Sequence, residues 1–412
     1  MNQKLRHDAE KAVLFAVNAV LPEDAVRRAL LGKTFPGRVF LLAVGKAAPR
    51  MAEAALDVLT VPVTRGLVIS KYGHFAHEIK GLHCMEAGHP VPDENSVLSA
   101  QAALKLTEEL QPDDTLLFLL SGGGSALFEK PLIPLEELRD VTDQLLACGA
   151  DIVEINTIRK RLSAMKGGKF AAHCAPAQIE AVILSDVLGD PLDAIASGPV
   201  SPDSASSADA LRIAEKYSLR LSDKALHCLQ EETPKYLTNV KAQIVGSVRE
   251  LCRAASDTCR SMGYEPIFLT DTLNCEAREA GRFLAAILRS HATEGRKLAF
   301  LAGGETVVHL TGKGLGGRNQ ELALAAAEGL RGLQNAALIS IGSDGTDGPT
   351  DAAGGYVDGE SYDALKAAGL DVNAVLQNND AYHALKAIDG LIVTGPTGTN
   401  VNDIAIALLD AQ

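Results

Sequence analysis

The segment 121–126, Ser-Gly-Gly-Gly-Ser-Ala, follows the apolar run 116–120 and could bind an anion. Three consecutive glycines allow close approach of the backbone to a ligand and supply several N–H donors. A tight flexible turn would explain the same residues, but the position directly after a buried strand favours binding. We therefore predict contacts to substrate or nucleotide from Ser121, Gly122, Gly123, Gly124 and Ser125.

Two other turns combine glycine with a cation. Lys46 follows Gly45 between an apolar run and a helical pattern, where a helix N-terminus already favours anions. The turn is not a Walker A loop, because Ala47 stands where that loop has the magnesium-binding Ser or Thr. A lysine that merely begins a surface helix explains the pattern equally well.

The second turn, 312–317, has the spacing G-x-G-x-x-G after the strand-like segment 307–310. This pattern is typical of dinucleotide-binding turns, but a single match is weak. Arg318 comes next, at the start of a predicted helix, and a guanidinium there suits a phosphate or carboxylate. The segment therefore indicates an anionic ligand more firmly than it indicates NAD.

Clusters of charge complete the candidates. The segment 155–171 holds five cations, and either phosphate neutralisation or a solvated helix face explains them. Aspartates also cluster in the segments 185–203 and 342–355, and carboxylates at strand ends suit magnesium or a general base. Caps and turns use aspartate as well. The residues concerned are Arg159, Lys160, Arg161, Lys166 and Lys169, then Asp186, Asp190 and Asp193, then Asp344, Asp347 and Asp351.

The elements that must hold these residues alternate between short apolar runs and helical patterns, which predicts α/β domains with parallel sheets. Ligands bind beyond the carboxyl ends of such strands, where these Gly, Ser, Asp and Lys residues lie. The predicted strands lie in 38–46, 65–73, 114–124, 180–190, 297–305, 337–348 and 390–400. The predicted helices are 47–58, 95–110, 135–148, 247–262, 276–293, 319–331 and 402–411.

Composition narrows the class of protein. A chain of 412 residues predicts two or three domains, and the polar segment 223–241 with Pro234 marks the expected boundary. The net charge of −13 argues against nucleic acid or an anionic membrane as a partner. Seven irregularly spaced cysteines predict reduced thiols. With neither a signal-peptide pattern nor a bilayer-length apolar run, we expect a cytoplasmic protein.

Eight segments, in order, resemble the glycerate 2-kinase family of the MOFRL type. They are AVGKAA, GHPVPDENS, LLSGGGSALF, NTIRKRLSAMKGGK, SDVLGDPLDAIASGP, GGETVVHLTGKGLGGRNQE, GSDGTDGPTDAAGG and GPTGTNVND. The resemblance covers nearly the whole chain and is weakest at the N-terminal helix and over 204–296.

The resemblance implies two α/β domains with the active site in the cleft between them. The larger one, 1–232, would be Rossmann-like with a mostly parallel sheet, and the smaller one, 233–412, would be of the MOFRL type. It also implies ATP-dependent phosphorylation of D-glycerate to 2-phosphoglycerate with a divalent ion, taken here as Mg²⁺. A hydroxypyruvate reductase using NAD(P)H is the alternative. A homo-oligomer is left open.

The resemblance assigns the catalytic pair to Lys46 and Arg318, acting on one phosphoryl group. Asp186 is added as a metal ligand or base, and Asp190 and Asp344 as metal ligands. Besides the loop 121–125, the predicted substrate and nucleotide contacts are Arg159, Lys160, Glu305, Gly317 and Asn319.

Overall fold

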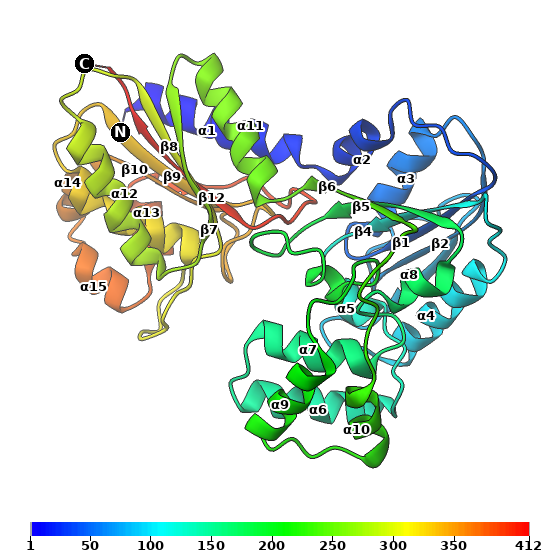
Figure 1. Ribbon diagram of the computed structural model, residues 1–412. Helices are drawn as coiled ribbons and strands as arrows, with labels where there is room; N and C mark the ends of the chain where they lie inside the picture. The colour runs from blue at the N-terminus through cyan, green and yellow to red at the C-terminus, as the bar shows by residue number, and fades with distance from the viewer. Residues whose placement is uncertain (1, 412) are drawn as a thin grey trace. The chain divides into compact units, whose positions relative to one another are not determined.

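The computed structural model describes residues 2–411 and divides them into two compact units. The N-terminal unit is 22–245, and the C-terminal unit combines 2–21 with 246–411. Each is an α/β unit with one six-stranded sheet, as predicted (Figure 1).

This division differs from the predicted boundary at 232/233 in two respects. The first helix, α1 (Gln3–Ala19), belongs to the C-terminal unit, where it packs against α11 (Val248–Ser261) and where the backbone N–H of Asn2 donates to Asp358 at 2.7 Å. The segment 223–241 is no linker either: it contains α10 (Asp223–Gln230) and runs into β6 (Val240–Gly246), the last strand of the N-terminal sheet. The division thus falls at 245/246, four residues beyond the polar segment 223–241.

The N-terminal sheet has the strand order β3-β2-β1-β4-β5-β6. The pairs β1–β2, β1–β4, β2–β3 and β4–β5 are parallel. This is the Rossmann order, in which the chain switches direction between β1 and β4 and ligands bind beyond their carboxyl ends. The strands are β1 (Val39–Val44), β2 (Val63–Lys71), β3 (His83–Ala87), β4 (Thr115–Leu120), β5 (Gln178–Leu184) and β6 (Val240–Gly246).

Helices cover both faces of this sheet because its central strands are apolar on both sides. Side chains such as Leu41 and Ala43 pack with α2 and α3 on one face, whereas Phe40 and Leu42 pack with α4 and α8 on the other. Four further helices, α6, α7, α9 and α10, build a small core of their own around Ile158 (Figure 1). The helices are α2 (Pro22–Leu30), α3 (Ala48–Val58), α4 (Glu94–Thr107), α5 (Gly124–Leu127), α6 (Leu135–Ala147), α7 (Ile152–Leu162), α8 (Lys169–Cys174), α9 (Ser207–Lys216) and α10 (Asp223–Gln230), with a 3-10 turn at Ile195–Ser197.

The C-terminal sheet is mixed, not parallel, with the order β11-β10-β9-β12-β8-β7. Among the strands of residues 2–411 in this sheet, only β7 and β8 pair in parallel, whereas β12 runs antiparallel to both β8 and β9, and β10 to both β9 and β11. The prediction of a helix over 402–411 was wrong, because these residues form β12, which is buried along its whole length. The strands are β7 (Glu265–Leu273), β8 (Leu298–Gly304), β9 (Ala336–Gly342), β10 (Gly354–Asp358), β11 (Leu391–Ile392) and β12 (Asp403–Leu409).

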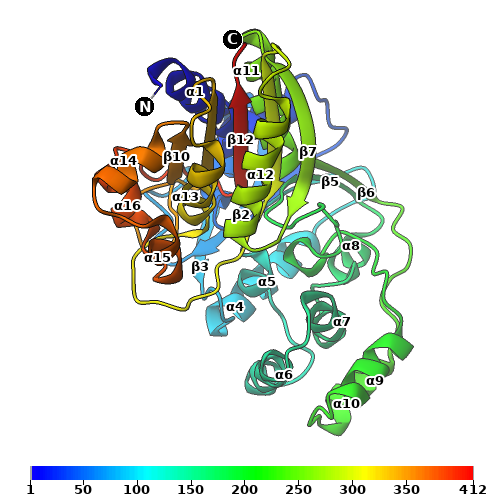
Figure 2. The same cartoon turned by 90° about the vertical axis from the view of Figure 1, so that its left-hand side faces the viewer.

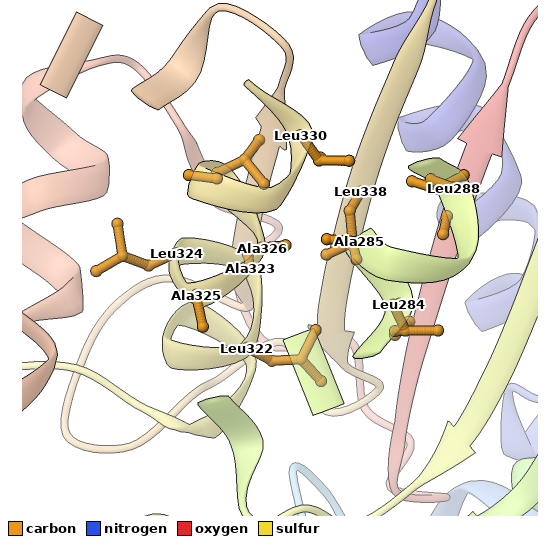
Figure 3. Packing of buried hydrophobic residues seen from close by; sticks show 14 of the residues in the cluster. Leu284, Ala285, Leu288, Leu322, Ala323, Leu324, Ala325, Ala326, Leu330 and Leu338 are labelled. Atoms are coloured by element: carbon orange, nitrogen blue, oxygen red, sulfur yellow. The ribbon is translucent and has the colours of Figure 1, made fainter. Parts of the chain in front are cut away.

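Two helices on one face of this sheet position the segment that carries Arg318. Helices α12 and α13 pack side by side over β9 and β12 (Figures 2 and 3). Their approach needs small residues: a Cβ on Gly281 would lie 2.1 Å from the carbonyl oxygen of Leu322. Helices α1 and α11 also contact strands of this sheet. The helices are α11 (Val248–Ser261), α12 (Ala277–His291), α13 (Arg318–Leu330), α14 (Ser361–Ala367), α15 (Val372–Gln377) and α16 (Ala381–Ala387).

Two expectations from composition concern the chain as a whole. All seven cysteines are free thiols, and Cys174, Cys252 and Cys259 are buried, as predicted for reduced thiols. Across residues 2–411, no helix combines the length and hydropathy that a membrane span requires.

Candidate active site

Lys46 lies in the turn between β1 and α3, at the carboxyl end of β1. Its N–H donates to the carbonyl of Gly122 at 2.9 Å, which ties this turn to the triple-glycine loop, 121–125. Gly45 has φ +127°, and a Cβ there would lie 2.2 Å from Oγ of Ser121. Among the described residues, Nζ of Lys46 has neither a hydrogen-bond partner nor a carboxylate partner. A cation without an internal partner, at the switch point of a Rossmann sheet, is placed to bind an anion.

Each of the three glycines in the loop is contacted by a side chain from another segment. A Cβ on Gly122 would lie 2.1 Å from Oδ2 of Asp186, and one on Gly124 would lie 2.7 Å from Cβ of Ala196. Gly123 has φ +91°, in the region that favours glycine. The glycines are therefore needed for the assembly of the site itself, which is a different reason from the predicted close approach of a ligand.

Both serines of the loop hold the protein together. Oγ of Ser121, a buried residue, accepts the N–H of Ala47 at 3.1 Å, and so fixes the turn of Lys46. Oγ of Ser125 is 3.0 Å from Oγ of Ser197. Direct contact with a ligand stays a prediction for Ser125, whereas the position of Ser121 favours a supporting role.

The basic segment 155–171 separates into two kinds of residue. Arg159 donates from its guanidinium to the carbonyl of Ser125 at 3.1 Å, and its Nε is buried without a partner. Burial lowers the pKa of Arg159, an effect that Glu129 opposes. Arg159 is thus the member of the cluster that touches the triple-glycine loop.

Lys160 has an internal role. It is 4% exposed, and its Nζ is 3.1 Å from Asp193 and 3.0 Å from Asp203. Asp203 also pairs with Arg161 at 3.3 Å, and both of these side chains are fully buried. These cations are neutralised inside the protein, so they form neither the phosphate-binding cluster nor the solvated helix face that the sequence suggested.

The segment after β5 carries the predicted acidic residues on an unusual backbone. Asp190, Ala196 and Ser197 have φ of 54°, 51° and 60°, values that residues other than glycine rarely adopt. Such conformations persist only where the surrounding structure enforces them, and they are frequent at functional sites. Oδ1 of Asp190 is buried with no hydrogen-bond partner. Of the acidic residues on this segment, Asp186 lies against the triple-glycine loop.

Sequence reasoning missed His89, which lies just beyond the carboxyl end of β3. A Cβ on Gly123 would be 3.1 Å from Cδ2 of His89, 3.3 Å from its Nε2 and 3.3 Å from Cγ of Lys46. The imidazole and the lysine thus meet over the same glycine. The signal was present in the segment GHPVPDENS, which contributed to the resemblance without any residue of it receiving a role.

In the C-terminal unit, Arg318 is the first residue of α13 and is held by two carboxylates. Nε and one terminal nitrogen donate to Asp403 at 2.5 and 3.0 Å, and the other terminal nitrogen donates to Glu305 at 2.8 Å. Burial lowers the pKa of Arg318, but the hydrogen bonds and the negative charge of Asp403 outweigh this effect, so the pKa of Arg318 is raised overall. Burial also raises the pKa of Asp403 to about 6. Glu305 was predicted to contact a ligand, and here it orients the guanidinium.

The N-terminus of α13 is occupied by a side chain of the protein. Asp347 accepts the N–H groups of Asn319 and Gln320 at 3.1 and 2.8 Å, and a Cβ on Gly317 would lie 2.3 Å from its carboxyl carbon. Asn319 is 1% exposed and accepts the hydroxyl of Ser340 at 2.6 Å. Gly317 and Asn319 therefore support the position of Arg318, and their positions do not favour direct contact with a ligand.

The G-x-G-x-x-G segment has a structural role. The preceding residues 307–310 form no strand beyond an isolated bridge at Val307. A Cβ on Gly312 would lie 2.3 Å from the backbone of Asn378, and one on Gly314 would lie 2.4 Å from Cβ of Asp380. These glycines allow two loops of the same unit to pack together, so the strand–turn–helix context that dinucleotide binding requires is missing here.

Asp344 follows β9 as predicted, but its carboxylate is partly engaged. Oδ1 accepts the N–H of Thr346 at 3.0 Å, as in many aspartate turns. Within the described part of the chain, no group of three or more His, Cys, Asp or Glu side chains is arranged to hold a metal ion. Neither Asp190 nor Asp344 thus belongs to a complete protein-only metal site.

Comparisons with known proteins cover both units. A domain of unknown function, DUF4147, matches residues 8–230, and the MOFRL family matches residues 298–403. The D-glycerate 2-kinase of Thermotoga maritima is 50% identical over 99% of each chain. The glycerate 2-kinase of Pyrococcus horikoshii is 43% identical over 98% of this chain and 94% of its own. Two proteins of Agrobacterium vitis, 40% and 38% identical over 90% of this chain, bear the provisional name hydroxypyruvate reductase.

Solved structures give the same answer for the fold. The crystal structure of the glycerate kinase from Thermotoga maritima matches 99% of this chain and 100% of its own, with a TM-score of 0.95 and 49% identity. A structure from Pyrococcus horikoshii matches with a TM-score of 0.92 and 40% identity over 99% of both chains. From these matches, the chain belongs to the glycerate 2-kinase family of the MOFRL type.

Proposed function

We propose that this chain is an ATP-dependent D-glycerate 2-kinase that forms 2-phosphoglycerate. The observation that carries the proposal is its 50% identity, over nearly the whole length, to an enzyme named D-glycerate 2-kinase. The geometry of the N-terminal unit supports it, because Lys46, His89 and Asp186 surround a glycine loop at the switch point of a Rossmann sheet. Phosphoryl transfer needs mainly positioning and charge neutralisation, which such a site offers.

Lys46 and Arg318 are the proposed cations for the transferring phosphoryl group. Lys46 has an unpartnered ammonium among the described residues, and Arg318 is fixed by Asp403 and Glu305. A fixed guanidinium loses little freedom when charge develops on the phosphoryl oxygens, and this preorganisation is what makes electrostatic stabilisation effective. Arg159 and the N–H groups of the triple-glycine loop are the proposed contacts for the anionic parts of the two substrates.

Mg²⁺ is part of the proposal. In phosphotransferases one or two carboxylates hold this ion together with substrate phosphates, so a group of three protein ligands is not required. Asp190 fits best, because its buried Oδ1 has no hydrogen-bond donor. Asp344 fits less well, since Oδ1 already accepts the N–H of Thr346. The bound ion would supply neutralisation of phosphate charge.

A reductase is the second candidate, on the strength of the two Agrobacterium vitis names. In dinucleotide-binding Rossmann units the Gly-rich fingerprint lies in the first strand–helix turn. Here that turn is the segment 44–48, Val-Gly-Lys-Ala-Ala, and G-x-G-x-x-G occurs only at 312–317, where it packs two loops together. The kinase is therefore favoured. An acidic chain with free cysteines also fits the proposed cytoplasmic location.

The decisive experiment identifies the product. The protein is incubated with ATP, Mg²⁺ and D-glycerate, and enolase is added with or without phosphoglycerate mutase. Phosphoenolpyruvate formed by enolase alone supports 2-phosphoglycerate. A requirement for the mutase would mean phosphorylation of the 3-hydroxyl instead. Oxidation of NADH by hydroxypyruvate, with no ATP consumed in the presence of D-glycerate, would establish the reductase.

A further inference from the structure

His89 has the position of a residue that meets the substrate. It follows β3 at the edge where β1 and β4 also end, and it lies over Gly123 beside the side chain of Lys46. Neither of its ring nitrogens has a hydrogen-bond partner within residues 2–411. An imidazole that the protein does not use internally, at the mouth of a ligand-binding sheet edge, is available to a ligand.

Burial and the groups that face His89 both favour its neutral form. Lys46 approaches from the end of β1, and Lys71 and His74 come from the end of β2 and the turn after it. Burial, followed by these three neighbours, lowers the pKa of His89. Asp93, at the start of α4, accepts the N–H of Gly88, the residue before His89, at 3.0 Å. A neutral imidazole carries a free electron pair, which can accept a proton.

We propose that His89 is a further catalytic residue, which accepts a hydrogen bond from the 2-hydroxyl of D-glycerate and takes its proton during phosphoryl transfer. This inference rests on the proposed function. The hydroxyl oxygen forms the new bond to the γ-phosphorus, and the bond from that phosphorus to the leaving oxygen breaks, with its electron pair going to ADP. The hydroxyl proton goes to a ring nitrogen of His89, which later releases it to solvent.

Asp186 is the competing acceptor, because it contacts Gly122 in the same loop. The reacting hydroxyl of glycerate is bonded to the carbon next to a carboxylate, and it approaches the anionic γ-phosphate. A second carboxylate placed at that hydroxyl would add repulsion between like charges at short range. A neutral imidazole surrounded by lysines avoids this repulsion and accepts the same proton, so the structure favours His89.

The test combines removal of the imidazole with its chemical replacement. In H89A we expect turnover to fall at least a hundredfold, as for the loss of a general base, with the KM for ATP changed less than about threefold. Added imidazole should restore turnover at least tenfold, and the restored rate should follow the neutral form of imidazole as the pH rises. The matched control is H83A, which removes an exposed histidine from the other end of β3 and should neither lose turnover nor respond to imidazole.

The pH profile gives a second readout. Since protonation of His89 removes the proton acceptor, kcat/KM of the unaltered enzyme should fall on the acid side of neutrality. H89Q should lack this decrease. Near-normal turnover in folded H89A would overturn the inference. The inference would also be overturned if imidazole did not restore the turnover of H89A and kcat/KM of H89Q still fell at acid pH. If the unaltered protein does not phosphorylate D-glycerate, the proposed function itself is wrong. If it does, but the H89A and H89Q results differ from those expected, only the role of His89 is wrong.

Discussion

Arg318 and Asp403 form a two-point ion pair, with Nε to Oδ2 at 2.5 Å and a terminal nitrogen to Oδ1 at 3.0 Å. The two residues come from the first turn of α13 and from the start of β12. This geometry matches the planar fork of a guanidinium to a carboxylate, which fixes orientation as well as distance. Asp403 is therefore the residue that aims Arg318, and its own charge state should affect the protein.

The first prediction concerns Asp403 and pH. Burial raises the pKa of Asp403 to about 6, above the ordinary value of 3.8. The folded state therefore binds this proton more readily than the unfolded state, so stability falls as the pH rises from about 4 through 6. The asparagine in D403N imitates the protonated form and should remove this loss. The variant should gain on the unaltered protein as the pH rises, by at most about 3 kcal/mol.

The measurement is the melting temperature of both proteins from pH 4 to pH 8. The difference, variant minus unaltered protein, should become more positive across this range and level off above pH 7. Arg318 should be less rigidly held in D403N at pH 7.5, so turnover should fall there even though the melting temperature of the variant gains on that of the unaltered protein as the pH rises. A melting difference that does not depend on pH would contradict the shift of the Asp403 pKa.

The second prediction concerns the proposed cation pair. Lys46→Ala and Arg318→Ala should each lower turnover by roughly a hundredfold or more, about 3 kcal/mol, as for the loss of one preorganised donor. Arg318→Lys should recover only part of this loss, because an ammonium cannot replace both nitrogens that Asp403 binds. Lys80→Ala, which removes an exposed lysine between β2 and β3, should leave turnover unchanged.

The double variant tests whether the two cations act on one phosphoryl group. Groups that act as a unit are not additive, so the double variant should be little worse than the poorer single variant. Full kinetic parameters for all four proteins measure this. If the two losses multiply, or if either alanine variant keeps near-normal turnover, the pair does not act as proposed.

The third prediction separates strain from contact in the triple-glycine loop. Gly123 and Gly81 both have positive φ, at 91° and 85°, so an alanine at either position should cost about 1 kcal/mol of stability. A Cβ at Gly81 meets nothing within 4 Å, whereas one at Gly123 meets His89 and Lys46. Gly123→Ala should therefore raise the KM for a substrate or lower turnover about tenfold, and Gly81→Ala should do neither. Equal kinetics in the two variants would mean that the loop only forms a turn.

Local sequence predicted the four inner strands of the N-terminal sheet but missed its edge strands, β3 and β6. In the C-terminal sheet it missed β7, β10 and β12, for a physical reason. Parallel strands buried on both faces are continuous apolar runs, as in β1 and β4, and these were recognised. In β12 the residues Asp403–Leu409 have the same composition as a buried helix, and short apolar runs do not distinguish the two. Which one forms is decided by the backbone partners on β8 and β9, which lie about 60 to 110 residues away in the sequence.

The candidate site shows the same limit. Strand ends and glycines located Lys46 and the triple-glycine loop, because those signals are local. For His89 the segment GHPVPDENS was the only signal, because no strand was predicted before it, and the order of the strands in space is what brings His89 over Gly123. In the basic segment 155–171, a ligand was predicted where the structure has an internal carboxylate partner. That partner of Lys160 and Arg161, Asp203, lies about 40 residues further along the chain, so no local pattern reveals it.

The last prediction follows from that buried charge. Lys160 was predicted to contact substrate or nucleotide, but its ammonium lies between Asp193 and Asp203 and is almost inaccessible. Lys160→Met keeps the length of the side chain but leaves Asp203 with one fewer cation in a buried setting, where loss of one partner typically costs 3–5 kcal/mol. Arg161 and Thr233 still bind Asp203, so the cost should fall at or below the lower end, about 3 kcal/mol, and the melting temperature should drop by several degrees. The KM for ATP, measured well below the melting transition, should stay within about twofold of the unaltered value.

Arg159→Met is the matched comparison on the same helix. The guanidinium of Arg159 touches Ser125 of the triple-glycine loop, so this change should raise the KM or lower turnover at least tenfold. An unchanged melting temperature with a tenfold higher KM for ATP in Lys160→Met would instead support the predicted contact of Lys160 with a ligand.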